Sequence, residues 1–257
     1  MATNNVYDSL RMAAGYSFDR PPVHRHVTRV IGEHLRLTRR VRRALDVGCG
    51  AGLSTAALEP LADSAVGLEP VPNMLRHSRA VAPRAAFLVG QAERLPFPAE
   101  SFDLVTAAGS VNYVDLALFL PEVARVLVPA GVLAIYDFSA GRRLRDDDRL
   151  DAWYAAFEQR YPPKPGYETD MRTLAYGAAK LQLEAYAAFE VAVPMTLPSY
   201  AMYVMSETGV ELAVARGVPE AGIRAWCEST LAGVLDAGPR DVLFDAYVAY
   251  VARARSA

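Results

Sequence analysis

The sequence of 257 residues contains only two cysteines, Cys49 and Cys227. Two cysteines so far apart can build neither a disulfide framework nor a cysteine-ligated metal cluster. A fold stapled by disulfides is therefore excluded, and we expect no bound metal. A reducing cytoplasm is the simplest compartment for such a chain.

The chain also lacks an excess of either charge and any long apolar run. Its formal net charge is −2 at pH 7, and 52% of its residues are hydrophobic. This balance gives no general attraction for nucleic acid or for an anionic membrane. No stretch of about 20 residues is free of charge, and the first residues do not combine a basic segment with an apolar core. We expect neither a membrane span nor a signal peptide.

What the chain does have is an apolar run that ends in three glycines spaced two apart, Leu45 to Gly52. Val41 to Leu45 follow a buried-strand pattern and residues 53–58 a helix pattern, so the glycines occupy a strand-to-helix turn. Glycine reaches positive φ and has no Cβ, so the backbone can pass close beneath a ligand with its N–H groups exposed. A nucleotide site is implied.

The spacing and the neighbouring acids indicate which nucleotide binds. The dinucleotide fingerprint G-x-G-x-x-G needs a glycine at position 53, where this chain has Leu53. Glu69 ends the next apolar run, about 20 residues on, where an acid can bind both ribose hydroxyls. Asp46 adds negative charge beside the loop, which suits a cationic ligand better than a pyrophosphate. The ligand we infer is S-adenosylmethionine.

These motifs resemble the class I S-adenosylmethionine-dependent methyltransferases, in particular the small-molecule branch of the ubiquinone-biosynthesis type (type 11). The resemblance covers roughly the first 140 residues, in the family's order, and is specific because several motifs occur together. The matching segments are residues 45–52, 67–70 with 73–75, 90–97, 101–105 and 125–129.

The resemblance implies a set of cofactor-binding residues. The glycines lie beneath the methionine, Glu69 binds the ribose, and the segment after the third strand contacts the adenine. The full set is Tyr16, Arg20, Asp46, Gly48, Cys49, Gly50, Gly52, Glu69, Pro70, Met74, Gln91, Ala92 and Gly109. Many relatives carry Asp in place of Gln91; the glutamine can accept through its carbonyl oxygen but brings no charge.

The acceptor side departs further from the family. Many small-molecule relatives have a histidine near Asn112 or Tyr113 that can serve as general base, and this chain has none there. Asp137, at the end of the fifth strand, is the leading candidate for orienting or deprotonating the acceptor, with Tyr113 and His24 as further candidates. The alternative role for Asp137 is a salt bridge with Arg142 or Arg143.

Two N-terminal features each have two interpretations. In the family a similar tyrosine and arginine-proline segment folds over the cofactor, so Tyr16 and Arg20 either line the methionine end of the site or only anchor the terminus. The basic run Arg36 to Arg43 could contact phosphates. Since no aromatic residues alternate with the arginines, we interpret the run as a solvated helix end.

The predicted fold is α/β: a doubly wound, mostly parallel seven-stranded sheet with a helical cap. We expect one methyltransferase domain over residues 1–257. Its core comprises about 25–140, 189–197 and 241–252, and the last strand is antiparallel. The cap comprises insertions at about 141–188 and 198–237, whose aromatic residues either form a core or enclose an acceptor.

The predicted function is methylation of a small, largely apolar or aromatic metabolite on oxygen, nitrogen or carbon. The alternatives are a non-catalytic S-adenosylmethionine-binding module, an RNA methyltransferase and a nicotinamide-dependent oxidoreductase. The near-neutral charge disfavours RNA, and Leu53 with Asp46 disfavours a nicotinamide cofactor. We expect a small-molecule acceptor and no nucleic-acid partner.

Overall fold

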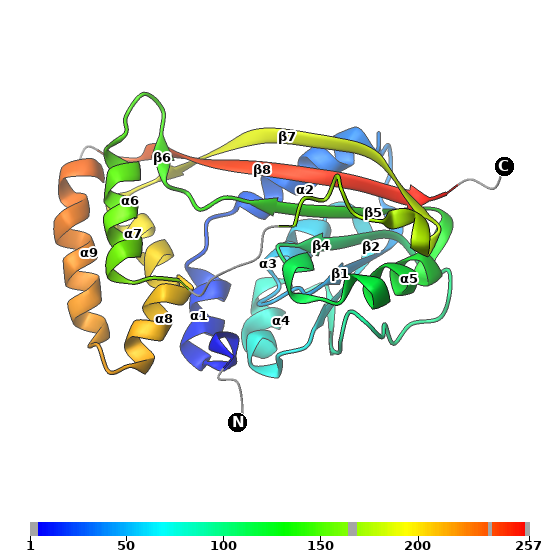
Figure 1. Cartoon of the computed structure of the whole chain (residues 1–257), viewed down its shortest axis with the longest axis horizontal. Helices are drawn as coiled ribbons and strands as arrows, with labels where there is room; N and C mark the ends of the chain where they lie inside the picture. Colours follow the sequence, from blue (N-terminus) through cyan, green and yellow to red (C-terminus); the bar gives the residue numbers. More distant parts are fainter. Residues whose placement is uncertain (1–4, 164–168, 236–237, 255–257) are drawn as a thin grey trace.

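Five parallel strands form the part of the sheet that the sequence pattern predicts most directly (Figure 1). They are β1 (Val41–Val47), β2 (Ala62–Glu69), β3 (Ala86–Val89), β4 (Phe102–Ala108) and β5 (Leu127–Phe138). The computed structural model describes residues 5–163, 169–235 and 238–254. Their spatial order is β3-β2-β1-β4-β5, so the chain reverses direction across the sheet between β1 and β4. Ligands bind at such a reversal, outside the carboxyl ends of the strands.

Two long antiparallel strands complete the sheet beyond β5. Strand β8 (Arg240–Arg253) pairs antiparallel with β5, and β7 (Leu181–Met195) pairs antiparallel with β8 along its length. The predicted antiparallel last strand is confirmed. The predicted sixth strand is longer than expected, because it begins at Leu181 and not near Phe189.

An eighth strand, β6 (Arg143–Leu144), is only two residues long and was not predicted. It pairs with Val242 and Leu243 of β8, whose other edge is occupied by β7 at the same positions. It therefore lies on the edge of β8 that β5 also uses and continues the line of β5. The mostly parallel sheet of the prediction holds, with this short addition.

Two apolar clusters cover the two faces of the sheet. Consecutive residues of β1 divide between them, Ala44 on one face and Leu45 on the other, as expected for a strand buried on both sides. On the first face lie α2 (Val23–His34) and α3 (Leu53–Leu58), and on the second lies α5 (Leu116–Val126).

Short helices connect these elements and precede them. They are η1 (Val6–Asp8), α1 (Leu10–Phe18), η2 (Pro72–His77), α4 (Ser78–Val81), η3 (Val111–Tyr113) and η4 (Tyr176–Ala179). Residues 72–81 form the 3-10 helix η2 followed directly by the single turn α4. None of the helices in the described ranges is long and apolar enough to cross a bilayer.

Four helices gather at one end of the sheet and form the cap: α6 (Arg149–Arg160), α7 (Leu197–Met205), α8 (Thr208–Ala215) and α9 (Glu220–Leu235) (Figure 1). The Trp153 ring stacks on Phe157 and Trp226 and packs edge-to-face with Tyr200. The first apolar cluster of the sheet continues into these side chains without a break. Residues 164–168 and 236–237 of the predicted cap lie outside the described ranges.

Candidate cofactor and acceptor site

The glycine loop follows β1 and has the backbone that its sequence predicts. Gly48, Gly50 and Gly52 have φ of +70°, +53° and +94°. A Cβ on Gly48 would lie 2.4 Å from Cβ of Ser110, whose hydroxyl donates to the Val47 carbonyl at 2.8 Å. Only glycine fits this position, since both the left-handed backbone and the close neighbour exclude a side chain.

Asp46 fixes the loop from below. Its carboxylate accepts hydrogen bonds from the hydroxyls of Ser54 at 2.6 Å, Thr55 at 2.7 Å and Thr106 at 2.8 Å. The residue is 0% exposed. Burial raises the pKa of Asp46, and the three hydroxyls counteract part of that rise. The structure thus shows Asp46 joining α3 and β4 beside the loop; that it also binds the cofactor stays a prediction.

Glu69, at the end of β2, is joined to the loop directly. Its Oε2 accepts from the Gly50 N–H at 2.9 Å, and its Oε1 accepts from the Val71 N–H at 3.0 Å. Burial raises the pKa of Glu69, and these two N–H groups oppose the rise. Each carboxylate oxygen keeps a second lone pair, so the group can still accept from two hydroxyls of a ligand above the loop.

The other predicted cofactor residues surround this acid. Met74 is buried, with its Cε 3.6 Å from the position of a Cβ on Gly50. Gln91 is exposed one residue after Gly90, whose N–H donates to the Glu69 carbonyl, so both belong to the same edge of the sheet. The side chains of Cys49 and Ala92 are buried and Pro70 is exposed. Burial raises the pKa of the Cys49 thiol, which keeps it protonated and unreactive.

Helix α1 covers the loop. Ala13 of α1 clusters with Ala51 and Met74, and Tyr16 packs against this cluster. The Tyr7 and Tyr16 rings pack edge-to-face, and the hydroxyl oxygens of Tyr7 and Tyr113 are 3.2 Å apart. The predicted residues Tyr16 and Tyr113 are thus brought together by Tyr7, although Tyr113 remains 69% exposed.

Arg20, which follows α1, faces the cap. Its guanidinium lies 4.2 Å above the Tyr16 ring, pairs with Glu207 at 3.0 Å and donates to the Ser206 carbonyl at 2.9 Å. Arg11 similarly pairs with Glu211 at 2.7 Å. Arg20 therefore ties α1 to the cap as well as to Tyr16.

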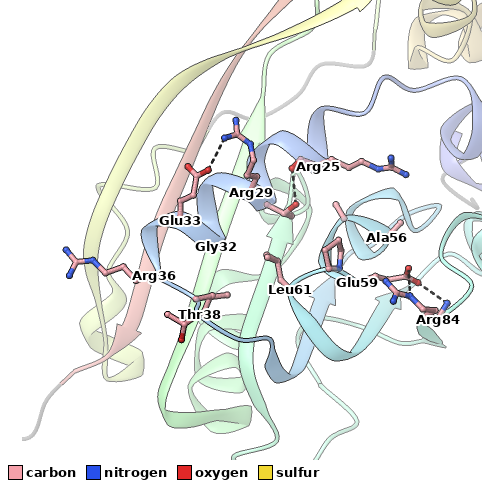
Figure 2. Close-up of a pocket in the computed structure, with 14 residues that line it drawn as sticks. Arg25, Arg29, Gly32, Glu33, Arg36, Thr38, Ala56, Glu59, Leu61 and Arg84 are labelled. Carbon is pink, nitrogen blue, oxygen red and sulfur yellow. Dashed lines mark hydrogen bonds and ion pairs between the residues drawn. The ribbon is translucent and has the colours of Figure 1, made fainter.

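A groove of about 840 Å³ lies elsewhere, between α2 and α3, and no residue of the glycine loop lines it (Figure 2). The presence of a groove therefore does not mark the cofactor site. We place that site at the loop because backbone geometry, Glu69 and α1 converge there. This placement agrees with the carboxyl-end rule for open α/β sheets.

Comparison with known proteins identifies the family of this region. Residues 45–135 match the family model of the methyltransferase domain. An uncharacterized methyltransferase of Mycobacterium tuberculosis is 42% identical over 94 residues, which cover 37% of this chain and 39% of that protein. The region is a class I methyltransferase domain.

Other relatives of the methyltransferase domain agree with this assignment. The phthiotriol/phenolphthiotriol dimycocerosates methyltransferase of Mycobacterium leprae is 37% identical over 121 residues, covering 45% of this chain and 43% of that protein. The chain thus spans about two fifths of the length of these curated relatives. A solved structure from Anaeromyxobacter dehalogenans, named as a candidate type II methyltransferase, matches with a TM-score of 0.68 at 22% identity, over 89% of this chain and 95% of that one. At that identity the likeness shows the fold alone.

On the acceptor side of the methyltransferase domain, Asp137 lies next to Gly109. A Cβ on Gly109, whose φ is +62°, would be 3.1 Å from Oδ1 of Asp137, which also accepts from the Phe138 N–H at 2.8 Å. Arg142 pairs with Asp151 and Glu158, and Arg143 with Glu190 and Asp245. The salt bridge proposed as the alternative role of Asp137 is not formed with either arginine.

His24, on the first turn of α2, contacts the other face of β5. Its Nδ1 lies 3.0 Å from the hydroxyl of Tyr136, and successive strand residues point to opposite faces. His24 and Asp137 therefore do not form a pair. Burial, together with the positive charge of Arg20, lowers the pKa of His24 to about 4.

The aromatic side chains of the cap form a core. Seven of them are buried: Trp153, Tyr154, Phe157, Tyr161, Tyr176, Tyr200 and Tyr203. They pack on one another or on the sheet, and Tyr200 and Tyr203 bind the Gly141 backbone through their hydroxyls. Of the two interpretations of the cap aromatics, the core is what these seven side chains form; that the cap encloses an acceptor stays a prediction.

Sequence reasoning missed the residues that support the site from other elements. The hydroxyls of Ser54, Thr55 and Thr106 were not assigned a role, nor was Tyr7. The signal for the first two was present. A carboxylate predicted to be at the end of a buried strand needs donors, and two hydroxyl residues begin the following helix.

The glycine backbone gives a testable expectation. Gly48→Ala should lower the free energy of unfolding by about 1–3 kcal/mol, because it forces alanine into a left-handed conformation, with a further loss from the contact with Ser110. The control is Gly222→Ala on an exposed turn of α9, where nothing lies within 4 Å and helix propensity predicts a gain of about 1 kcal/mol. Urea unfolding measures both; equal effects would contradict the assigned loop geometry.

His24 gives a second expectation, a pH dependence. In the unfolded chain His24 is protonated below its ordinary pKa of 6.5, whereas in the folded protein it stays neutral until about pH 4. Between these pH values the unfolded state binds more protons, so acidification favours unfolding. The free energy of unfolding should fall less steeply from pH 6.5 to 4 in His24→Gln than in the parent. His26→Gln, on the same helix, is the control. An unchanged slope in the His24 variant would show that the ring is not shielded.

Proposed function

We propose that this protein transfers a methyl group from S-adenosylmethionine to a small, largely apolar or aromatic metabolite. The single observation that carries the proposal is the hydrogen bond from the Gly50 N–H to Glu69, at 2.9 Å. It holds the ribose-binding acid at a fixed place relative to the glycine backbone that would lie beneath the methionine. The family match over residues 45–135 supports the same cofactor.

The residues present fit that cofactor. Gly48, Gly50 and Gly52 have the positive φ that a tight turn beneath a ligand requires, and Glu69 keeps lone pairs for the two ribose hydroxyls. Met74 would pack on the adenosine, and Gln91 with the Ala92 N–H would bind the adenine. When bound, the cofactor supplies a methyl carbon already activated by a sulfonium.

Because that carbon is activated, the protein's main task is to hold the acceptor atom about 3 to 3.5 Å from it. We assign orientation and proton acceptance to Asp137, which lies at the carboxyl end of β5 beside Gly109. Tyr113 is a second orienting group, exposed near Tyr7.

His24 has a different role in this proposal. The buried hydroxyl of Tyr136 needs an acceptor for its hydrogen, and Nδ1 of His24 lies 3.0 Å away. With Nδ1 accepting, the ring proton is on Nε2, so neutral His24 is a hydrogen-bond donor. It would hold the Tyr136 hydroxyl on its own face of β5 and would not remove a proton from the acceptor that Asp137 orients.

The acceptor class rests on charge and relatives. The M. leprae relative is named for phthiotriol and phenolphthiotriol dimycocerosates, which are the substrates of that protein. The near-neutral charge of the chain is compatible with an apolar acceptor. Two buried free thiols suit the cytoplasmic location we propose.

Two alternatives lead to different observations. A non-catalytic binding module would bind the cofactor and release no S-adenosylhomocysteine with any acceptor in a broad screen of lipids, phenols and amines. An RNA methyltransferase would act on single-stranded or structured RNA and show a strong dependence on salt. The same screen with RNA included separates these outcomes.

Calorimetric titration tests the cofactor assignment. The parent should bind S-adenosylmethionine and S-adenosylhomocysteine and should not bind NADH. Glu69→Gln should weaken S-adenosylmethionine binding by about 1.5–3 kcal/mol, roughly ten- to a hundredfold in Kd, the value of hydrogen bonds to a charged group. Glu228→Gln, exposed on α9, is the control. Unchanged affinity in a folded Glu69 variant would sink the assignment.

Substitution of Asp137 tests the chemistry, once the screen has supplied an acceptor. Asp137→Asn keeps the shape and removes the charge, so turnover should fall by about 10²-fold or more if the carboxylate is the base. Tyr113→Phe should change turnover less, and Asp241→Asn, at an exposed position of β8, is the control. If both site variants retain full turnover, positioning alone drives the transfer and our catalytic residues are wrong.

A further inference from the structure

The groove between α2 and α3 is lined by residues to which the proposed methyltransferase function assigns no role. Its volume is about 840 Å³, within the range of small-molecule sites. Its floor is apolar and includes Leu61, Ala56 and Ala57, with Gly32 above them on α2 (Figure 2). A Cβ on Gly32 would lie 3.0 Å from Cδ2 of Leu61, so the glycine lets α2 approach Leu61 closely at this point of the groove.

Paired charges line the sides of the groove. Arg29 pairs with Glu33 at 2.9 Å on the α2 side, and Arg84 pairs with Glu59 at 3.2 Å on the α3 side. Each pair is internally neutral, so neither side attracts an ion of one sign strongly. The sides are therefore compatible with an uncharged ligand body lying between them.

The two ends of the groove are different. Arg25 and Arg36 are exposed, and neither forms an ion pair with any residue in the described ranges. Figure 2 shows them at opposite ends of the groove. Arg36 lies just beyond the end of α2, and eleven residues at a rise of 1.5 Å each put the two Cα atoms roughly 16 Å apart. A single compact anion cannot engage both guanidinium groups.

Other occupants fit this arrangement less well. Single-stranded nucleic acid binds through aromatic side chains that stack on bases, and the lining residues include no aromatic ring. A membrane surface would need large apolar side chains projecting from the rim, and the exposed large apolar side chains of the described chain lie outside this groove. A small inorganic anion would leave the apolar floor unused.

We propose that this groove binds an elongated amphipathic dianion, with an apolar middle on the floor and an anionic group at each end. Arg25 binds one end and Arg36 the other, each by the planar fork that suits carboxylates and phosphates alike. The site is separate from the glycine loop, so its ligand is neither the cofactor nor the methyl acceptor. The conclusion does not depend on the proposed methyl transfer.

Isothermal titration with a matched series of probes tests the proposal. The probes are dodecanedioate, with a carboxylate at both ends; dodecanoate, with one; 1,12-dodecanediol, with none; and succinate, which has two charges but little length. Dodecanedioate should bind most tightly, by about three- to fivefold over dodecanoate, the gain from one exposed ion pair. Its affinity should fall with added salt. Hexadecyl phosphate and inorganic phosphate then show whether a phosphate end group is preferred to a carboxylate.

Variants locate the binding. Arg25→Gln and Arg36→Gln should each reduce dodecanedioate to the affinity of dodecanoate, and Ala56→Phe should abolish binding of both by filling the floor. Arg216→Gln, an exposed arginine at the end of α8, is the control. Circular dichroism and urea unfolding confirm that each variant is folded. The proposal is overturned if the parent does not bind dodecanedioate, if the mono- and dianion bind equally, or if the control variant loses as much as the groove variants.

Discussion

The buried carboxylate of Asp46 is the interaction on which the rest of the site depends. An ionisable group with no exposed surface is costly unless donors surround it, and here three hydroxyls do so. They come from the first turn of α3 and from β4, so one side chain joins three elements at the carboxyl edge of the sheet. The glycine loop connects β1 to α3, two of these elements. Because both of its ends are fixed, the Gly50 N–H has a fixed direction toward Glu69.

Helix α1 links the two halves of the site. One side of it packs Ala13 and Tyr16 against the loop and Met74. From the same segment, Arg11 and Arg20 reach Glu211 and Glu207 of the cap region. These ion pairs are partly buried, so they are screened less than surface pairs. The segment that covers the glycine loop is therefore also bonded to the cap.

Most of the fold could be predicted from local sequence patterns, whereas the features that the sequence analysis missed depend on contacts between residues far apart in the chain. The strand-to-helix turn at Gly48 to Gly52 and the parallel strands follow from short segments whose signals are complete in themselves. The orientation of the Asp46 side chain could not be predicted from nearby residues alone, because one of its partners, Thr106, is 60 residues away. His24 and Tyr136 are 112 residues apart, so no spacing could reveal their contact. Leu181 to Ala188 alternate in exposure as a strand does, but the tyrosine and alanines there were interpreted as cap.

Strands β7 and β8 have a consequence for how ligands enter. They are 15 and 14 residues long, about 50 Å at 3.3 Å per residue, and run from the sheet into the cap (Figure 1), with a register shift between Leu183 and Ala185. A hinge needs a few residues that can change φ and ψ freely, and a paired ladder offers none. The cap therefore cannot rotate away from the sheet as a rigid body. Helix α1, which packs on the glycine loop, belongs to no strand ladder, so these two strands do not restrain its displacement.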